Sequence, residues 1–182
     1  MKPRCKVALR GAQRGMALIT SLLFMVAALI LGVSVMSTNV MQERMLGNAR
    51  DQDLAMQAAE AALRDAEQEI AAGFVDATLL FTDACANGLC TPPSQRTPRS
   101  PLPVHLQPGF TWVGKRGYGD NTGVDPFPMV SGQPVYVIEF LGFLPPRPGR
   151  SLTAGSPPAF RITARATGAR ASTVVILQTI FG

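Results

Sequence analysis

The sequence predicts an α+β protein in which a long N-terminal helix is followed by an antiparallel β-sheet head. Residues 16–36 contain no charged side chain, and residues 37–72 contain no proline and are rich in helix-forming residues. Residues 160–166 alternate apolar and polar side chains in the two-residue period of a strand. With 182 residues, the chain has room for about one ordinary domain behind such a helix.

The uncharged run from Met16 to Met36 has 21 residues, and about 20 suffice for a helix to cross a bilayer core. A cleaved secretory signal fits less well, because its apolar core has about 7–15 residues and an A-x-A site should follow. An uncleaved signal anchor would fit the length of the run, but it does not explain why Gly15 lies between the last basic residue and the first apolar residue. The positive residues before the run predict a cytoplasmic N-terminus and an exported remainder. These residues are Lys2, Arg4, Lys6, Arg10 and Arg14.

The stretch after the apolar run is expected to continue as an amphipathic helix that packs on the head, with Gly73 as its stop. Apolar side chains recur there at helical spacing. They are Ala55, Ala59, Ala62, Ala66 and Ile70, with Leu63 beside them. Charged side chains are expected to fall largely outside this stripe. They are Glu60, Arg64, Asp65, Glu67 and Glu69.

The head is expected to contain three clear strands and one short candidate. Residues 160–166 and 173–181 form a hairpin around Gly168, residues 135–143 form a third strand, and residues 110–113 are the candidate. Proline-rich segments at 91–109 and 145–158 are expected to be extended surface loops.

Cysteine usage indicates an oxidising compartment. If Cys5 is removed with the basic leader, Cys85 and Cys90 remain as a pair separated by four residues, and a disulfide between them is sterically plausible. Zinc is the competing reading, but two further ligands are missing and His105 is the only histidine. We therefore predict the disulfide and no metal site.

The net charge of +5 does not indicate a nucleic-acid-binding protein. Residues 1–15 hold five of the 17 basic side chains, which leaves 12 basic and 12 acidic residues in the rest. Residues 16–90 carry 3 basic and 9 acidic side chains, and residues 91–182 carry 9 basic and 3 acidic ones. This asymmetry suits head-to-stalk packing between copies or an anionic partner, and scattered solvated arginines explain it about as well.

No catalytic or cofactor-binding constellation is found. Glu67 and Glu69 are expected on different helix faces, and His105 has no serine or cysteine partner in a motif. The glycines of WVGKRGYGDNTG lack the strand-to-helix context of a phosphate loop. Two further groups of residues are candidate binding sites. The first is too sparse for a calcium site, and the second is too sparse for a site that binds a nucleic-acid strand. They are Asp120, Asn121 and Asp125, and Trp112, Lys115 and Arg116.

A basic leader that ends in Gly15 and is followed by Met16-Ala17-Leu18-Ile19 and an apolar helix resembles the class III signal of type IV pilins and pseudopilins. Segments 43–67 and 160–181 resemble the PilX-type minor pilins. The resemblance implies a pilin-like lollipop that a prepilin peptidase cuts after Gly15 and N-methylates at Met16. It also implies a removed leader at 1–15, a transmembrane and filament-core helix at 16–36, its amphipathic second half at 37–73 and a periplasmic head at 74–182.

The fifth mature position is Thr20, where major pilins carry a glutamate that pairs with the N-terminal amine of a neighbouring subunit. Without that carboxylate, no amine of a subunit ahead can be neutralised, and a lone buried amine is costly. The resemblance therefore implies a minor pilin that primes type IV pilus assembly and lies at or near the tip, supporting motility and adhesion.

The implied partners are other minor pilins, the major pilin, a large tip adhesin, the prepilin peptidase and the inner-membrane assembly platform. The protein would sit in the inner membrane with its head in the periplasm and then in the pilus. A tip-located K-type pseudopilin of type II secretion is the nearest alternative. A membrane-anchored periplasmic binding domain that never polymerises is an alternative of another class.

Overall fold

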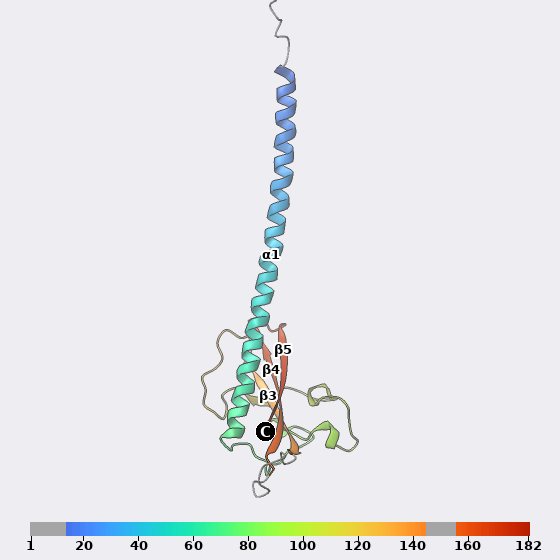
Figure 1. Ribbon diagram of the computed structural model, residues 1–182, viewed down its shortest axis with the longest axis vertical. Coiled ribbons are helices and arrows are strands. Elements are labelled where there is room, and N and C mark those ends of the chain that lie inside the picture. Colours follow the sequence, from blue (N-terminus) through green and yellow to red (C-terminus); the bar gives the residue numbers. More distant parts are fainter. Residues whose placement is uncertain (1–13, 145–155) are drawn as a thin grey trace, which may run out of the picture. The chain divides into compact units, whose positions relative to one another are not determined.

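A computed structural model describes residues 14–144 and 156–182 of the chain (Figure 1). The fold is α+β, with one long helix whose first part is apolar, followed by a mostly antiparallel sheet, a pilin-like arrangement. Two compact units divide at residue 47, so residues up to 47 and residues 48–182 are each taken separately. Helix α1, Arg14–Ala71, begins in the first unit and ends in the second.

In the first unit, α1 carries an apolar segment that nothing in its own unit covers. From Met16 to Val33 its mean hydropathy is 2.6, and none of these side chains is buried. This segment is long and apolar enough to cross a membrane. Such a segment fits a membrane anchor.

In the second unit, α1 packs on the sheet through small side chains. The predicted stripe is confirmed at Ala55, Ala59, Ala62 and Ala66, which are fully buried, whereas Leu63 and Ile70 are half-buried at its margin. Ala58 is also fully buried. Because alanine has no side chain beyond Cβ, the helix backbone can approach the strands closely.

The predicted stop of α1 at Gly73 is confirmed. Gly73 has φ 79°, a left-handed conformation that glycine adopts without a steric penalty. The Gly73 amide donates to the Ile70 carbonyl and the Phe74 amide donates to the Glu69 carbonyl. These two bonds form a Schellman motif, which satisfies the last carbonyl groups of the helix.

The sheet has the strand order β1-β3-β4-β5, with β2 also paired to β3. Strands β3, β4 and β5 are antiparallel neighbours, β2 is antiparallel to β3, and β1 is parallel to β3. The strands are β1 (Leu89–Cys90), β2 (Arg116–Gly117), β3 (Val135–Phe143), β4 (Pro158–Thr167) and β5 (Val174–Phe181). Short 3-10 helices are η1 (Ala86–Gly88), η2 (Pro93–Gln95) and η3 (Val104–Leu106).

The three clear strands of the sequence prediction are confirmed, and the candidate at 110–113 is wrong. At its two ends the Phe110 amide donates to the Gln107 carbonyl and the Lys115 amide donates to the Trp112 carbonyl. Both ends are therefore closed into turns rather than extended into a ladder. The strand in this part of the chain is β2, three residues later.

Each face of the sheet has its own core. On the α1 side, Tyr136, Ile138, Phe160 and Ile162 pack with the helix alanines. On the other face of β3, Val137 packs with Cys85, Cys90 and Val104, with Phe110 and Trp112 beside them. Segment 85–112, which we call the disulfide layer, covers this face of β3, except that its strand β1 lies beside β3 in the sheet and Leu89 packs in the core on the α1 side. The expectation of a surface loop at 91–109 is wrong in part, because Pro92, Pro93 and Val104 are buried. Most of the segment expected as a loop at 145–158 lies outside the described residues.

Candidate functional site

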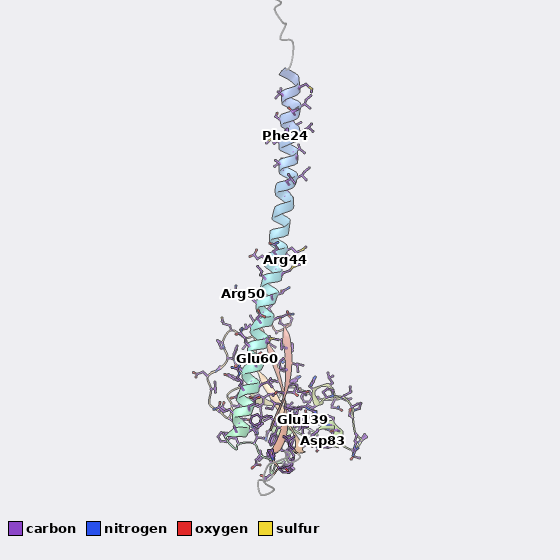
Figure 2. The ribbon with its side chains drawn as sticks, viewed as in Figure 1. Phe24, Arg44, Arg50, Glu60, Asp83 and Glu139 are labelled. Atoms are coloured by element: carbon purple, nitrogen blue, oxygen red, sulfur yellow. A yellow bond between two sulfur atoms is a disulfide. The ribbon has the colours of Figure 1, made fainter. Side chains whose placement is uncertain are left out.

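The residues expected at the processing site lie at the start of α1. Gly15 and Met16 belong to the helix, and the Met16 side chain is exposed. Cleavage after Gly15 and methylation of Met16 stay predictions, since both concern chemistry performed on the chain by another enzyme. The following apolar side chains project from the helix, and Phe24 is an example (Figure 2).

The hydroxyl of Thr20 is hydrogen-bonded within its own helix. Its Oγ1 lies 3.0 Å from the Met16 carbonyl oxygen and 3.1 Å from the Ala17 carbonyl oxygen. Ser21 makes the same kind of bond to Leu18, at 2.9 Å. The polar groups near the start of the apolar segment are therefore satisfied locally, and neither residue carries a charge.

Two acidic residues one turn apart on α1 attach the helix to β2 and to the loop that follows it. The Glu69 side chain is fully buried, and Arg116 Nη1 donates to both of its carboxylate oxygens at 2.9 Å. Asp65 accepts hydrogen bonds from the Gly119 amide at 2.9 Å, from the Thr122 hydroxyl and from the Tyr136 hydroxyl at 3.1 Å. Burial, together with the charges of Glu69 and Asp65, raises the pKa of Tyr136, so its hydroxyl stays protonated as a donor.

A third acid, Asp51, holds the turn between β4 and β5. Its Oδ1 accepts from the Arg170 amide at 3.2 Å. The hydrogen bond from Thr173 and the amides of the turn lower the pKa of Asp51, so the carboxylate is ionised at neutral pH. Gly168 passes so close that an added Cβ would lie 2.6 Å from the Asp51 carbonyl oxygen, which no larger residue tolerates.

We call Asp51, Asp65 and Glu69 with their partners the helix clamp. The expectation that Asp65 and Glu69 fall outside the apolar stripe is wrong, because both are buried against the head. Periodicity alone could have placed Asp51 and Glu69. Glu69 lies seven residues after Ala62, and Asp51 lies eleven residues before Ala62. At 3.6 residues per turn, both separations are whole numbers of turns to within about 20°, so the three side chains share one face of the helix.

The disulfide layer is fixed by two cations. Cys85 and Cys90 form a disulfide and are both buried. Lys115 Nζ donates to the Cys85 carbonyl at 2.8 Å, and Arg96 Nε donates to the Thr91 carbonyl at 2.9 Å. The disulfide loop and Thr91 directly after it are thereby bound by two side chains that follow later in the chain.

Glu139 on β3 is a buried carboxylate beneath this layer (Figure 2). Neither of its oxygens has a hydrogen-bond partner among the described residues, and Arg161 Nη1 lies 3.7 Å from Oε2. Burial raises the pKa of Glu139, and the charges of Arg161 and Arg96 oppose that shift. An ionised Glu139 lacks the hydrogen bonds that would offset the desolvation of a buried charge.

The other residues singled out in the sequence do not converge. His105 is half-buried against Trp112, with the ring centroids 6.4 Å apart, and burial lowers the pKa of His105. Arg116 is paired with Glu69, and Lys115 donates to the backbone carbonyls of Ala84 and Cys85. Within residues 14–144 and 156–182, no group of three or more His, Cys, Asp or Glu side chains could hold a metal ion.

Two family models match the chain. The model described as PilX N-terminal matches residues 14–64, and the model described as Type IV pilus assembly protein PilX C-term matches residues 86–182. The first includes the apolar segment of α1, Thr20 and Asp51, and the second includes the disulfide layer after Cys85 and strands β1 to β5. No curated protein and no solved structure matches the chain significantly.

Breaking the ion pair of the helix clamp from one side should destabilise the head strongly. Replacement Arg116→Met leaves Glu69 buried without its cation, and we expect a loss of about 3–5 kcal/mol in the free energy of unfolding. The single replacement Glu69→Leu completes the set. The double replacement Glu69→Leu with Arg116→Met should lower the free energy of unfolding by clearly less than the sum of the two single replacements. Urea unfolding of the detergent-solubilised chain measures all three. The exposed Glu60→Gln serves as control, with an effect of about 0.5 kcal/mol or less, and strict additivity of the single losses would contradict a coupled pair.

Replacing the buried carboxylate by its neutral isostere should stabilise the head at neutral pH. A raised folded-state pKa means that the contribution of Glu139 is present below its ordinary pKa of 4.5 and is lost as pH rises through the folded-state value. We therefore expect Glu139→Gln to raise the melting temperature at pH 7 and to change it less at pH 4. Thermal unfolding at the two pH values tests this. A melting temperature lowered at pH 7 would show that the charge pair with Arg161 outweighs desolvation.

Proposed function

The chain belongs to the PilX family of type IV pilus assembly proteins, and we propose that it is a minor pilin that primes pilus assembly and remains at or near the tip. Family membership supports the minor pilin role itself. Proteins of this family are structural components of the pilus, so the proposed activity is assembly rather than catalysis.

Thr20 is the observation that carries the tip position. In a filament of packed apolar helices, the N-terminal amine of each processed subunit enters a medium in which an unpaired charge is expensive. A subunit that follows can neutralise it only with a charged acceptor. Thr20 has no charge, and its hydroxyl already donates to the Met16 and Ala17 carbonyls. A subunit ahead of this chain would therefore leave its amine unpaired, which favours a place with nothing ahead.

The apolar segment supports a transfer from lipid to a helical bundle. Its exposed side chains from Met16 to Val33 suit either environment, because neither supplies polar partners. In this proposal, residues 1–15 are removed, residues 16–36 anchor the chain in the inner membrane and later lie in the filament core, and residues 37–73 continue to a periplasmic head at 74–182. The cytoplasmic start of the chain follows from the basic residues before Gly15.

The partners in this proposal are other minor pilins, the major pilin, the prepilin peptidase, the inner-membrane platform and a large tip adhesin, and adhesion and motility follow from the pilus. A type II secretion pseudopilin would share the anchor and the missing glutamate, and the PilX match at both ends favours the pilus. A tethered periplasmic domain would keep its leader, which separates it from a pilin.

Processing should leave a mature chain that begins at Met16. We expect the intact mass of the membrane-extracted protein to equal residues 16–182 with one added methyl group and one disulfide. Gly15→Leu, which places a bulky residue at the cut, should leave the leader attached. An intact leader on the wild-type protein, or loss of the whole apolar segment, would contradict the assignment as a processed pilin.

Supplying the missing carboxylate should let the protein enter the shaft. We expect Thr20→Glu to appear along the filament in immunogold electron microscopy, whereas the wild-type protein labels one end, because the new charge can pair with the amine of a subunit ahead. Ser21→Glu is the matched control, since it adds the same charge one position away. Wild-type label along the shaft, or Thr20→Glu label confined to the end, would contradict the tip assignment.

A further inference from the structure

The last strand of the sheet has an unprotected edge. Strand β5 stands at one end of the strand order, and among the described residues only β4 pairs with it (Figure 1). It is eight residues long, contains no proline and no charged residue, and pairs with β4 without a register shift. Natural sheet edges are normally short, bulged or protected by lysine or proline, because unpaired backbone groups there recruit other strands.

The opposite edge shows the usual protection. Strand β1 has only two residues, one of which is the disulfide-bonded Cys90, and both are buried. The two edges of one sheet are thus treated differently, and only β5 offers a long, regular ladder. This contrast indicates that the β5 edge is kept open for a partner rather than left open by chance.

The side chains of β5 that face away from α1 form an exposed apolar row. Val174 is 42% exposed, Ile176 is 41% exposed and Ile180 is 63% exposed. On the other side of the same strand, Val175 and Leu177 are half-buried beside the helix alanines. Single exposed apolar residues are ordinary, but a row along an unprotected edge is a surface that another chain can bury.

Basic side chains adjoin this row on β4. Arg165 pairs in register with Ile176, and Arg161 pairs in register with Ile180. In the part of the chain that the structure describes, the side chain of Arg165 has no hydrogen bond or ion pair, although its backbone is paired with β3 and β5. The only acid among the side chains of β3, β4 and β5 is Glu139, which is buried, so the exposed surface beside the apolar row is basic.

We propose that the β5 edge binds an extended segment of a different chain, which adds a strand to the sheet and carries an acidic side chain for Arg165. The backbone of β5 would supply the ladder hydrogen bonds, and the row of Val174, Ile176 and Ile180 would select apolar side chains at alternate positions. Neighbouring strands lie about 4.8 Å apart, so the added strand would lie about 10 Å from β4. An arginine and a glutamate can bridge that separation across Ile176.

Charge argues against a second copy as the occupant. Two β5 edges paired with each other would bring two sets of Arg161 and Arg165 to one continuous sheet with no exposed acid among their strands. Like charges placed across strands are destabilising. A partner with an acidic, alternating segment meets the same backbone without that repulsion. The inference concerns the head alone and stands whether or not the chain occupies the tip.

Photocrosslinking in cells that make pili tests the proposal. A benzophenone amino acid replaces the exposed Gln178 in the full-length chain, and mass spectrometry maps the cross-linked peptide. We expect one segment of another chain, extended and containing an acidic residue. Ile176→Lys, Ile180→Lys or Arg165→Glu should each reduce the cross-link yield about tenfold, the effect of a change of about 1.4 kcal/mol in binding.

Val113→Lys is the matched control, because Val113 is 83% exposed and lies outside the sheet, and it should leave the yield unchanged. Melting temperatures of the purified variants establish that the head is folded. Cross-links confined to the chain's own residues or to a second copy would overturn the proposal. So would cross-links to a helix of another chain, or a yield that none of the three β5 and β4 replacements reduces.

Discussion

Three carboxylates on the sheet-facing side of a helix constrain the whole head. The alanine stripe lets α1 approach the sheet, but small side chains contribute little apolar area, and apolar burial stabilises by roughly 25 cal/mol per Å². The orientation of the helix is instead specified by directional bonds. Asp51 binds the β4–β5 turn, Asp65 binds the loop after β2, and Glu69 binds Arg116. Each of these bonds joins the helix to a part of the head that is distant from it in sequence. The helix clamp therefore connects α1 to both the β4–β5 turn and the β2 region.

How much the sequence could predict depends on whether an element is defined locally. The apolar run, the glycine stop at Gly73 and the strands β3, β4 and β5 each have a periodicity or a turn residue within a few positions, and each was found in its place. The clamp was missed because acidic residues were assumed to face water, although the spacing of Asp51 and Glu69 matches the alanine stripe. The disulfide layer was missed because its prolines suggested solvent-exposed loops, while its burial depends on contacts with β3 that no local pattern reveals.

The residues of the proposed function divide in the same way. Gly15, Met16 and Thr20 are recognisable from sequence because their meaning lies in position relative to the apolar run, and the structure adds that the Thr20 hydroxyl is bonded within its own helix. The open edge of β5 could not be recognised before the strand order was known. A strand of the same composition in the middle of the sheet would be ordinary core.

The placement of the disulfide layer has an evolutionary consequence. From Thr91 to Trp112 it covers the face of β3 opposite α1, and none of these residues belongs to the core cluster that contains Ala62 and Ala66. We therefore expect insertions, deletions or new loops in residues 91–112 to disturb the packing of α1 less than changes at Leu89, which lies in the same core cluster as Ala62 and Ala66. The side of the sheet that holds α1 is constrained by this packing, and the opposite side can vary more without altering the helix.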